Sequence, residues 1–320
     1  MRRSMKSLRA TNNGMIGPSS QKPLRSSLTD RRKRSGSSIA YWYLAPILIG
    51  LMVFTIGPVI ASLGLSLTHY EIGLAPKLIG LANYQSLLSS QLFWQVAEQT
   101  FYYALLYVPV SIGVSLALAS LIEKKTRGIA LFRTIYFLPV VTSTVAAAII
   151  WSWLYNGDVG LLNYLLSLLG ISGPQWLRDP HWAMPAIALM SVWKNAGYNM
   201  MILLAGLAQV PSDYHEAARL DGAGAFRRFR TITLPLLSPV LFFVLIVTTI
   251  GAFQVFEQTY VMTNGGPGTS TLTLSYYIWQ TAFEFFDLGR AAALGYLFFL
   301  IVLVFTFLQF RARKRWVFRP

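Results

Sequence analysis

The sequence predicts an all-α polytopic membrane protein with six transmembrane helices. Of its 320 residues, 54% are hydrophobic and only 12% are charged, and the apolar residues form long stretches nearly free of charge. A helix needs about 20 apolar residues to cross a hydrocarbon layer roughly 30 Å thick. Six stretches meet this requirement, at residues 41–68, 97–122, 131–155, 183–208, 236–263 and 289–310. We therefore expect a membrane domain over residues 41–310.

The net charge of +15 is distributed asymmetrically along the chain. Of the 27 Lys and Arg residues, ten lie in residues 1–40, four in 123–133, four in 219–230 and five in 311–319. The loops on the other side hold only Lys77 and Arg178. Because basic residues collect on the cytoplasmic side of membrane proteins, both termini are predicted to be cytoplasmic. This distribution favours membrane lipid as the partner of the positive charge and does not favour nucleic acid.

The two ends of the chain are predicted to be basic cytoplasmic segments. Residues 1–40 are rich in Ser, Arg, Asn and Gly, which is typical of a disordered tail, and residues 311–320 form a shorter basic C-terminus. The first apolar stretch is too long for the core of a cleaved signal peptide, so we expect it to remain as a helix. The chain has no Cys and three widely separated His residues, and we therefore expect no metal site.

A polar helix is predicted in the basic loop at residues 209–235. Ser212 or Asp213 after a proline can begin a helix, Glu216 follows Asp213 at the spacing of a capping box, and Gly222 can end the helix after about three turns. Pro235 then falls in the tolerated first turn of the fifth span.

The predicted loop helix has the properties of a docking element. Ala217 and Ala218 add almost no bulk, so a partner's backbone can approach closely, while the Glu216 carboxylate can meet a basic group. The arginines that follow, Arg227, Arg228 and Arg230, can meet anionic lipid headgroups.

At this loop the sequence resembles the membrane permeases of binding-protein-dependent ATP-binding cassette importers. The family signature is Glu-Ala-Ala, three residues, Gly, nine residues, then Ile, one residue and Leu-Pro. The matching positions are Glu216, Ala217, Ala218, Gly222, Ile232, Leu234 and Pro235. Asp221 and the residues after it, with the Thr263–Thr271 stretch, are similar to the carbohydrate group, the maltose-type permeases. The resemblance covers roughly residues 41–310.

The resemblance implies a type I permease fold in which Glu216–Gly222 is a cytoplasmic coupling helix seated in a groove of an ATPase subunit. It also implies a heterodimer with a second permease of the same family, two ATPase subunits and an extracytoplasmic solute-binding protein, in a prokaryotic cytoplasmic membrane. The sequence has no Gly-x-x-x-x-Gly-Lys-Ser/Thr loop, so we expect no cofactor on this chain and no enzyme activity of its own. ATP and Mg would be used by the ATPase partner.

Two polar clusters inside the predicted spans are candidates for the solute pathway. Polar groups at this depth are costly unless they face a partner or a wet cavity. The first cluster, in the fourth span, comprises Trp193, Lys194, Asn195, Gly197, Tyr198 and Asn199. The second, in the fifth span, comprises Phe253, Gln254, Glu257 and Gln258. Aromatic and amide groups suit a sugar or polyol, but helix packing through Gly197 and a bond from Lys194 to a neighbouring helix or to Glu257 explain these residues equally well.

The function that the sequence favours is translocation of a sugar, oligosaccharide or related polyol into the cytoplasm. Glycosylated osmolytes and glycerol phosphate remain open as solutes. An ion-coupled secondary carrier is the alternative, and it would have to rely on Glu257, the single acidic residue well inside a predicted span.

Overall fold

The computed structural model describes residues 42–73, 75–122 and 128–318, so the predicted tail at residues 1–40 lies outside the described residues. The chain divides into two units, residues 1–60 and 61–320. The described part of the first unit belongs to an apolar helix that runs from Trp42 to Ser66. This helix includes a π-helical turn at Met52–Ile56 and ends with α2 (Gly57–Ser66).

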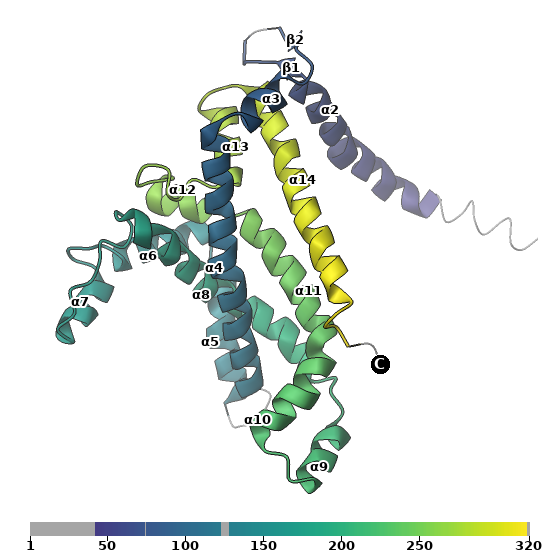
Figure 1. The fold of residues 1–320 in the computed structure, drawn as a ribbon, viewed down its shortest axis with the longest axis vertical. Coiled ribbons are helices and arrows are strands. Elements are labelled where there is room, and N and C mark those ends of the chain that lie inside the picture. Colours follow the sequence, from purple (N-terminus) through teal and green to yellow (C-terminus); the bar gives the residue numbers. More distant parts are fainter. Residues whose placement is uncertain (1–41, 74, 123–127, 319–320) are drawn as a thin grey trace, which may run out of the picture. The chain divides into compact units, whose positions relative to one another are not determined.

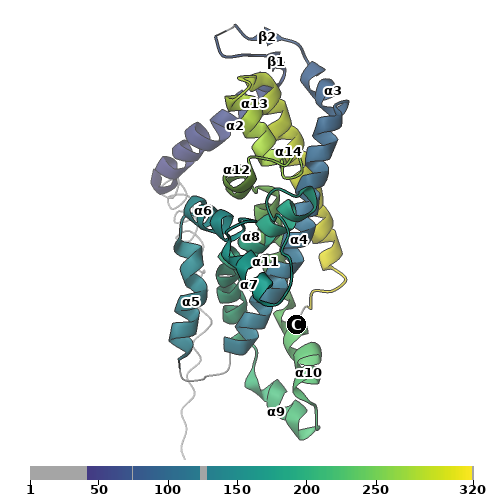
Figure 2. The ribbon, with the colours of Figure 1, turned by 90° about the vertical axis from the view of Figure 1, so that its left-hand side faces the viewer.

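The second unit is built around the long helices α4, α8, α11 and α14 (Figures 1 and 2). Helix α4 (Gln91–Ile122) packs along α8 (Pro180–Leu207), and both contact α11 (Leu234–Phe253). Helix α14 (Leu288–Arg313) contacts α11 and the shorter α13 (Leu274–Phe283). The architecture is therefore all-α, as predicted.

Several of the short elements lie at the two ends of the second unit. A two-stranded antiparallel sheet and helix α3 lie at one end, together with α13 (Figure 1). Helices α9 and α10 lie at the opposite end in both views (Figures 1 and 2). The short elements are β1 (Thr68–His69), β2 (Lys77–Leu78), α3 (Ala82–Leu88), α7 (Leu161–Leu168), α9 (Ser212–Leu220), α10 (Ala225–Arg228) and α12 (Glu257–Thr263).

Two of the predicted spans are not single helices. The third, predicted over 131–155, consists of α5 (Ile129–Val141) and α6 (Thr144–Leu154), which are bent by 98° at the break between them. The fifth, predicted over 236–263, ends as α11 at Phe253, and α12 follows after a break. Polar residues stand at both breaks, Thr142 and Ser143 at the first and Gln254 at the second, but single polar residues also occur inside unbroken helices and do not by themselves predict a break.

Four described helices are long and apolar enough to cross a membrane, or five if the bent pair α5–α6 is one span. Helix α8 covers the predicted fourth span but is not among them, since it carries Lys194, Asn195 and Asn199. The count of six spans and the cytoplasmic position of both termini stay predictions.

Two prolines inside long helices each follow a π-helical turn. The Met52–Ile56 turn precedes Pro58, and the Phe229–Thr233 turn precedes Pro235. A helical proline has no N–H and its ring crowds the carbonyl four residues earlier, and a π-turn widens the backbone at that point. Pro235 lies in the first turn of α11, as expected, but helical structure continues back through the π-helical turn to Ala225, so the candidate span begins before Pro235.

Three apolar clusters hold the second unit together. The first joins α4, α6, α8 and α12 through residues such as Tyr103, Met184 and Met262. The second joins α4, α13 and α14, and the third joins α4, α8 and α11 near α10. Helix α4 takes part in all three clusters and α8 in two of them, so the α4–α8 pair is the centre of this unit.

Candidate functional site

The predicted docking helix forms as α9. It is followed by Gly222, whose φ of +74° is a left-handed conformation that glycine adopts without strain. The N–H of Ala223 donates to the carbonyl of Ala218 at 2.9 Å and the N–H of Gly222 to that of Arg219 at 3.0 Å, the pattern of a Schellman motif. The predicted capping box is wrong, because the N-cap is Pro211 and it makes no side-chain cap. A proline has no side-chain acceptor, and helix α9 begins one residue before Asp213.

The α9 surface is open over almost its whole length. Glu216, Ala217 and Asp221 are exposed, and no described residue forms an ion pair with Glu216. Beside them, Leu220 is 90% exposed and Phe226 is 76% exposed. Apolar side chains this exposed in a polar loop are typical of an interaction surface. The structure therefore leaves both the carboxylate and the apolar side chains of this loop available to a partner.

The second half of the motif attaches α9 to the helical bundle. Arg228 donates from Nη1 to the carbonyl of Ala223 at 2.6 Å, which fixes the turn between α9 and α10. Ile232 lies in the π-helical turn, and Leu234 packs against the apolar cluster of α4, α8 and α11. A short helical connection, α10 and the π-helical turn, therefore joins α9 to α11.

Lys194 supports the break between α5 and α6. Its Nζ donates to the carbonyl of Thr142 at 2.9 Å and to that of Pro139 at 3.4 Å. Carbonyl groups at a helix end have no partner within the helix, so a buried ammonium group stabilises them. Among the residues that the structure describes, no ion pair joins Lys194 to Glu257. The bond to a neighbouring helix, one of the alternatives, is the one observed.

Gly197 and Asn199 connect α8 to three helices. A Cβ atom on Gly197 would collide with the backbone carbonyl of Tyr136 in α5, so α8 and α5 approach closely at this point. The Asn199 amide donates to Ser111 in α4 at 3.2 Å and to Thr248 in α11 at 3.0 Å. These bonds satisfy a buried amide between three helices.

The remaining pathway candidates differ in exposure. Trp193 is 43% exposed and Tyr198 is 46% exposed, while Gln254 and Glu257 are also exposed and Asn195 and Gln258 are half-buried. Phe253 is fully buried, with its ring in edge contact with Phe101 and Phe305. Trp193 packs on Trp151 of α6, with 5.4 Å between ring centroids. The structure therefore does not bring the ten candidates together as one group.

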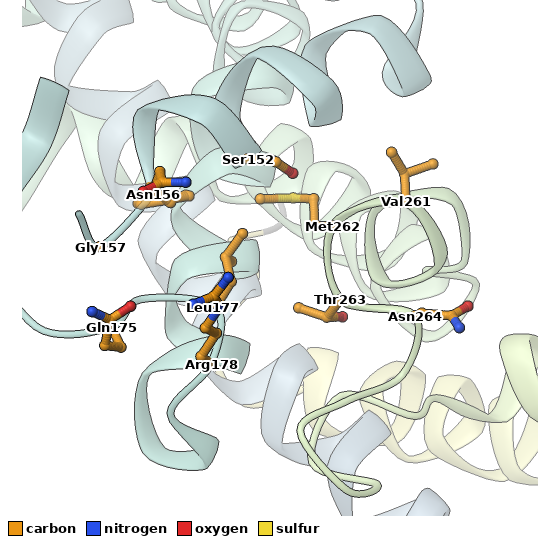
Figure 3. Close-up of a pocket in the computed structure, with 11 residues that line it drawn as sticks. Ser152, Asn156, Gly157, Gln175, Leu177, Arg178, Val261, Met262, Thr263 and Asn264 are labelled. Atoms are coloured by element: carbon orange, nitrogen blue, oxygen red, sulfur yellow. The ribbon is translucent and has the colours of Figure 1, made fainter. Parts of the chain in front are cut away.

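A polar cavity of about 390 Å³ lies between the end of α6, the loop before α8 and the end of α12 (Figure 3). Met262 and Thr263 face Leu177 and Arg178, whereas the Asn264 side chain points away and accepts a hydrogen bond from Tyr276 at 2.6 Å (Figure 3). The predicted topology places this cavity on the outer side. Its residues were not predicted from the sequence, because the cavity is made by loops far apart in the chain.

Beside this cavity, Asp179 begins helix α8. Its carboxylate accepts a hydrogen bond from the backbone N–H of His181 at 2.8 Å and contacts the His181 ring at 3.1 Å. The backbone hydrogen bond is the main reason why the pKa of Asp179 is lowered, and the His181 ring lowers it further.

The long apolar helices and the exposed α9 loop are those of a polytopic membrane protein with an exposed polar surface. Comparison with known proteins specifies this class. Residues 100–317 match the family described as binding-protein-dependent transport system inner membrane component. The chain belongs to this family, whose members are permease subunits and not the ATPase.

Two relatives and one solved structure are similar over most of the chain. The trehalose/maltose transport system permease protein MalF of Thermococcus litoralis is 36% identical over 292 residues, which cover 90% of this chain and 97% of that protein. The lactose transport system permease protein LacF of Rhizobium radiobacter is 38% identical over 278 residues, covering 85% of this chain and 93% of that protein.

The solved structure is that of a bacterial alginate ABC transporter in complex with alginate pentasaccharide-bound periplasmic protein. One of its chains is similar with a TM-score of 0.78 and 23% identity, covering 91% of this chain and 98% of that chain. The protein therefore has the type I permease fold of ABC importers, which confirms the predicted fold class.

Proposed function

We propose that this chain translocates a sugar, oligosaccharide or related polyol into the cytoplasm as the permease subunit of an ATP-driven importer in a prokaryotic inner membrane. Two relatives that cover most of the chain are permeases for trehalose/maltose and lactose, which supports a carbohydrate solute. They lend no support to the ion-coupled carrier. Glu257 also begins the separate helix α12 beyond the end of α11, so it is not inside a long apolar helix.

The observation that carries the proposal is the exposed motif on α9. Glu216, Ala217 and Ala218 stand at the family spacing from Gly222, and the Schellman motif fixes the end of the helix that presents them. A short helix with small side chains and one carboxylate suits a groove lined by basic groups on an ATPase subunit. That subunit would bind ATP and Mg, and this chain would bind neither.

The assembly that we propose contains a second permease of the same family, two ATPase subunits and an extracytoplasmic solute-binding protein. The binding protein would dock on the outer side and release its solute when nucleotide-driven closure of the ATPases opens the pathway outward. Hydrolysis would then return the pathway to its inward-open state. The similar alginate transporter structure includes a periplasmic protein, which supports the binding-protein partner.

We propose that the solute contacts the accessible candidates. Trp193 and Tyr198 offer aromatic faces, and the side chains of Asn195, Gln254, Glu257 and Gln258 offer groups that hydrogen-bond to hydroxyls. Lys194, Gly197, Asn199 and Phe253 would act indirectly, because each already contacts a neighbouring helix or ring.

The test is ATPase activity of the complex purified through a tag on this chain, reconstituted with its binding protein and a panel of sugars, polyols and glycerol phosphate. Stimulation by one ligand would identify the solute class. If no ATPase copurifies, the proposal of an ATP-driven importer is wrong. If an ATPase copurifies and only a non-carbohydrate stimulates it, the transport class stands and the solute class is wrong.

A further inference from the structure

The C-terminal residues 314–318, which we call the C-terminal hook, fold back from α14 onto the beginning of α11. The backbone N–H of Phe318 donates to Oγ of Ser238 at 2.8 Å. The same hydroxyl group donates to the carbonyl of Pro235 at 2.6 Å. The hook is therefore bonded to α11 within one turn of the Leu-Pro end of the α9–α11 motif.

Aromatic contacts hold the hook in place beside these hydrogen bonds. The ring of Phe242 lies 6.0 Å from Trp316 and 5.2 Å from Phe310, both in edge contact. The guanidinium carbon of Arg313 lies over the Phe242 ring at 5.5 Å from its centroid. A cation over an aromatic face is attracted by the ring, so the charge of Arg313 is already occupied within the chain.

The other basic side chains of this segment are not paired in this way. Arg311, Lys314 and Arg315 are exposed, and none of them forms an ion pair with any residue of the described ranges. They line a concave site of about 430 Å³ together with Leu308 and Ala312. Leu308 is 54% exposed. The site thus joins three free cations to an exposed apolar side chain.

The position of the site on the span narrows the class of ligand. Helix α14 is one of the described helices able to cross a membrane, and the three cations lie at its final residues and just beyond. The boundary between hydrocarbon and water therefore falls close to them. A ligand that fits both features has an anionic group attached to an acyl chain.

We propose that the C-terminal hook forms a binding site for the phosphate of an anionic phospholipid headgroup on the cytoplasmic side. Arg311, Lys314 and Arg315 bind the phosphate oxygens by charge-assisted hydrogen bonds, and the first acyl carbons lie along Leu308. The hook is bonded to Ser238, so an occupied site also stabilises the contact between the hook and the helix that carries the α9 loop.

The experiment measures lipid retained by the purified full-length chain in native mass spectrometry, with phosphatidylglycerol compared with phosphatidylcholine. The test variant is Arg311→Gln/Lys314→Gln/Arg315→Gln. The matched control is Lys77→Gln/Arg133→Gln/Arg219→Gln, which removes the same charge from exposed residues that are not assigned to lipid contact. Each basic residue near an anionic lipid surface contributes about a fivefold gain in affinity, so the test variant should bind phosphatidylglycerol about a hundredfold more weakly.

Loss of phosphatidylglycerol in the test variant, with retention in the control, supports the site. Equal loss in both variants would mean that diffuse positive charge attracts the lipid, and the proposal would be overturned. Equal retention of the two lipids by the unmodified chain would overturn it as well. Inorganic phosphate that competes at millimolar concentration would identify a site for free phosphate and not for a lipid. The readout does not involve transport, so it is independent of the proposed solute.

Discussion

The α9 loop and the polar contacts around α8 are both rich in polar residues, but their polar groups are satisfied in different ways. On α9, Glu216 is exposed and has no partner among the described residues. On α8, Lys194 and Asn199 are buried and bond to three neighbouring helices. Under the proposed function another molecule supplies the partner of Glu216, whereas the α8 contacts are made within the chain.

Because of this difference, mutations on α9 and mutations at the α8 contacts are expected to act in different ways. A change on α9 alters nothing that the isolated chain needs, so its effect belongs to the assembled complex. A change at the buried α8 contacts removes or obstructs a contact between helices, so its effect begins with folding and reaches transport only afterwards. Measurements of folding and of activity on the same variants therefore distinguish the two regions.

The largest effect on activity is expected for Glu216→Lys. Reversing the charge of a group that faces a basic groove replaces attraction with repulsion, and the loss of a close charge pair at an interface is typically about 2–5 kcal/mol. Association with the ATPase subunit should weaken by about 30-fold or more, and uptake should fall accordingly. Copurification of the ATPase and solute uptake in vesicles measure the two quantities.

The comparison for this variant is Glu216→Gln, which removes the carboxylate charge and adds no repulsion. We expect an intermediate loss. Both variants should reach the membrane and unfold at the temperature of the unmodified chain, because Glu216 has no described partner within it. Normal uptake by Glu216→Lys would mean that α9 is not the coupling helix.

A smaller effect, and one that begins with the stability of the fold, is expected for Gly197→Ala. The added methyl group would collide with the Tyr136 carbonyl, and overpacking of this kind typically costs about 1–3 kcal/mol. Thermal unfolding in detergent should begin at a lower temperature. The control is Gly113→Ala in α4, where a Cβ atom meets nothing within 4 Å and alanine favours the helix. If the two variants unfold alike, the close approach of α5 and α8 is absent in solution.

The sequence predicted the helical class, most helix positions and the α9 loop correctly, because these depend on local features. Long apolar stretches identify helices wherever they are, and Gly222 ends α9 through its own backbone conformation. Leu220 and Phe226, exposed apolar residues in a polar loop, were missed although they stand in the sequence beside the motif.

The breaks in the third and fifth predicted spans and the polar cavity could not be predicted from local sequence, because they depend on contacts between distant segments. The end of α5 is stabilised by Lys194, 52 residues after Thr142. The polar cavity needs the loop before α8 and the end of α12 together. Nothing in the composition of either segment indicates its neighbour.

The smallest effect is expected at Asp179, which is half-buried and, like Lys194, has a partner within the chain. The backbone N–H of His181 stabilises the charged carboxylate, so the pKa of Asp179 lies below that of the unfolded chain. Its contribution is present above the unfolded pKa and is lost as the pH falls through the lower, folded pKa, below about 4. The first turn of α8 should therefore loosen at acidic pH.

Hydrogen exchange of the amides of residues 181–184, corrected for the intrinsic pH dependence of exchange, measures this loosening. In Asp179→Ala the turn should exchange faster at neutral pH and lose its extra sensitivity to acid. His181→Ala keeps the backbone N–H and removes only the ring, so it should retain most of that sensitivity. If His181→Ala abolishes it instead, the ring contact dominates over the cap. If Asp179→Ala exchanges like the unmodified chain at both pH values, Asp179 does not stabilise the first turn of α8. Asp179 would then resemble Glu216, a carboxylate that the isolated chain does not use.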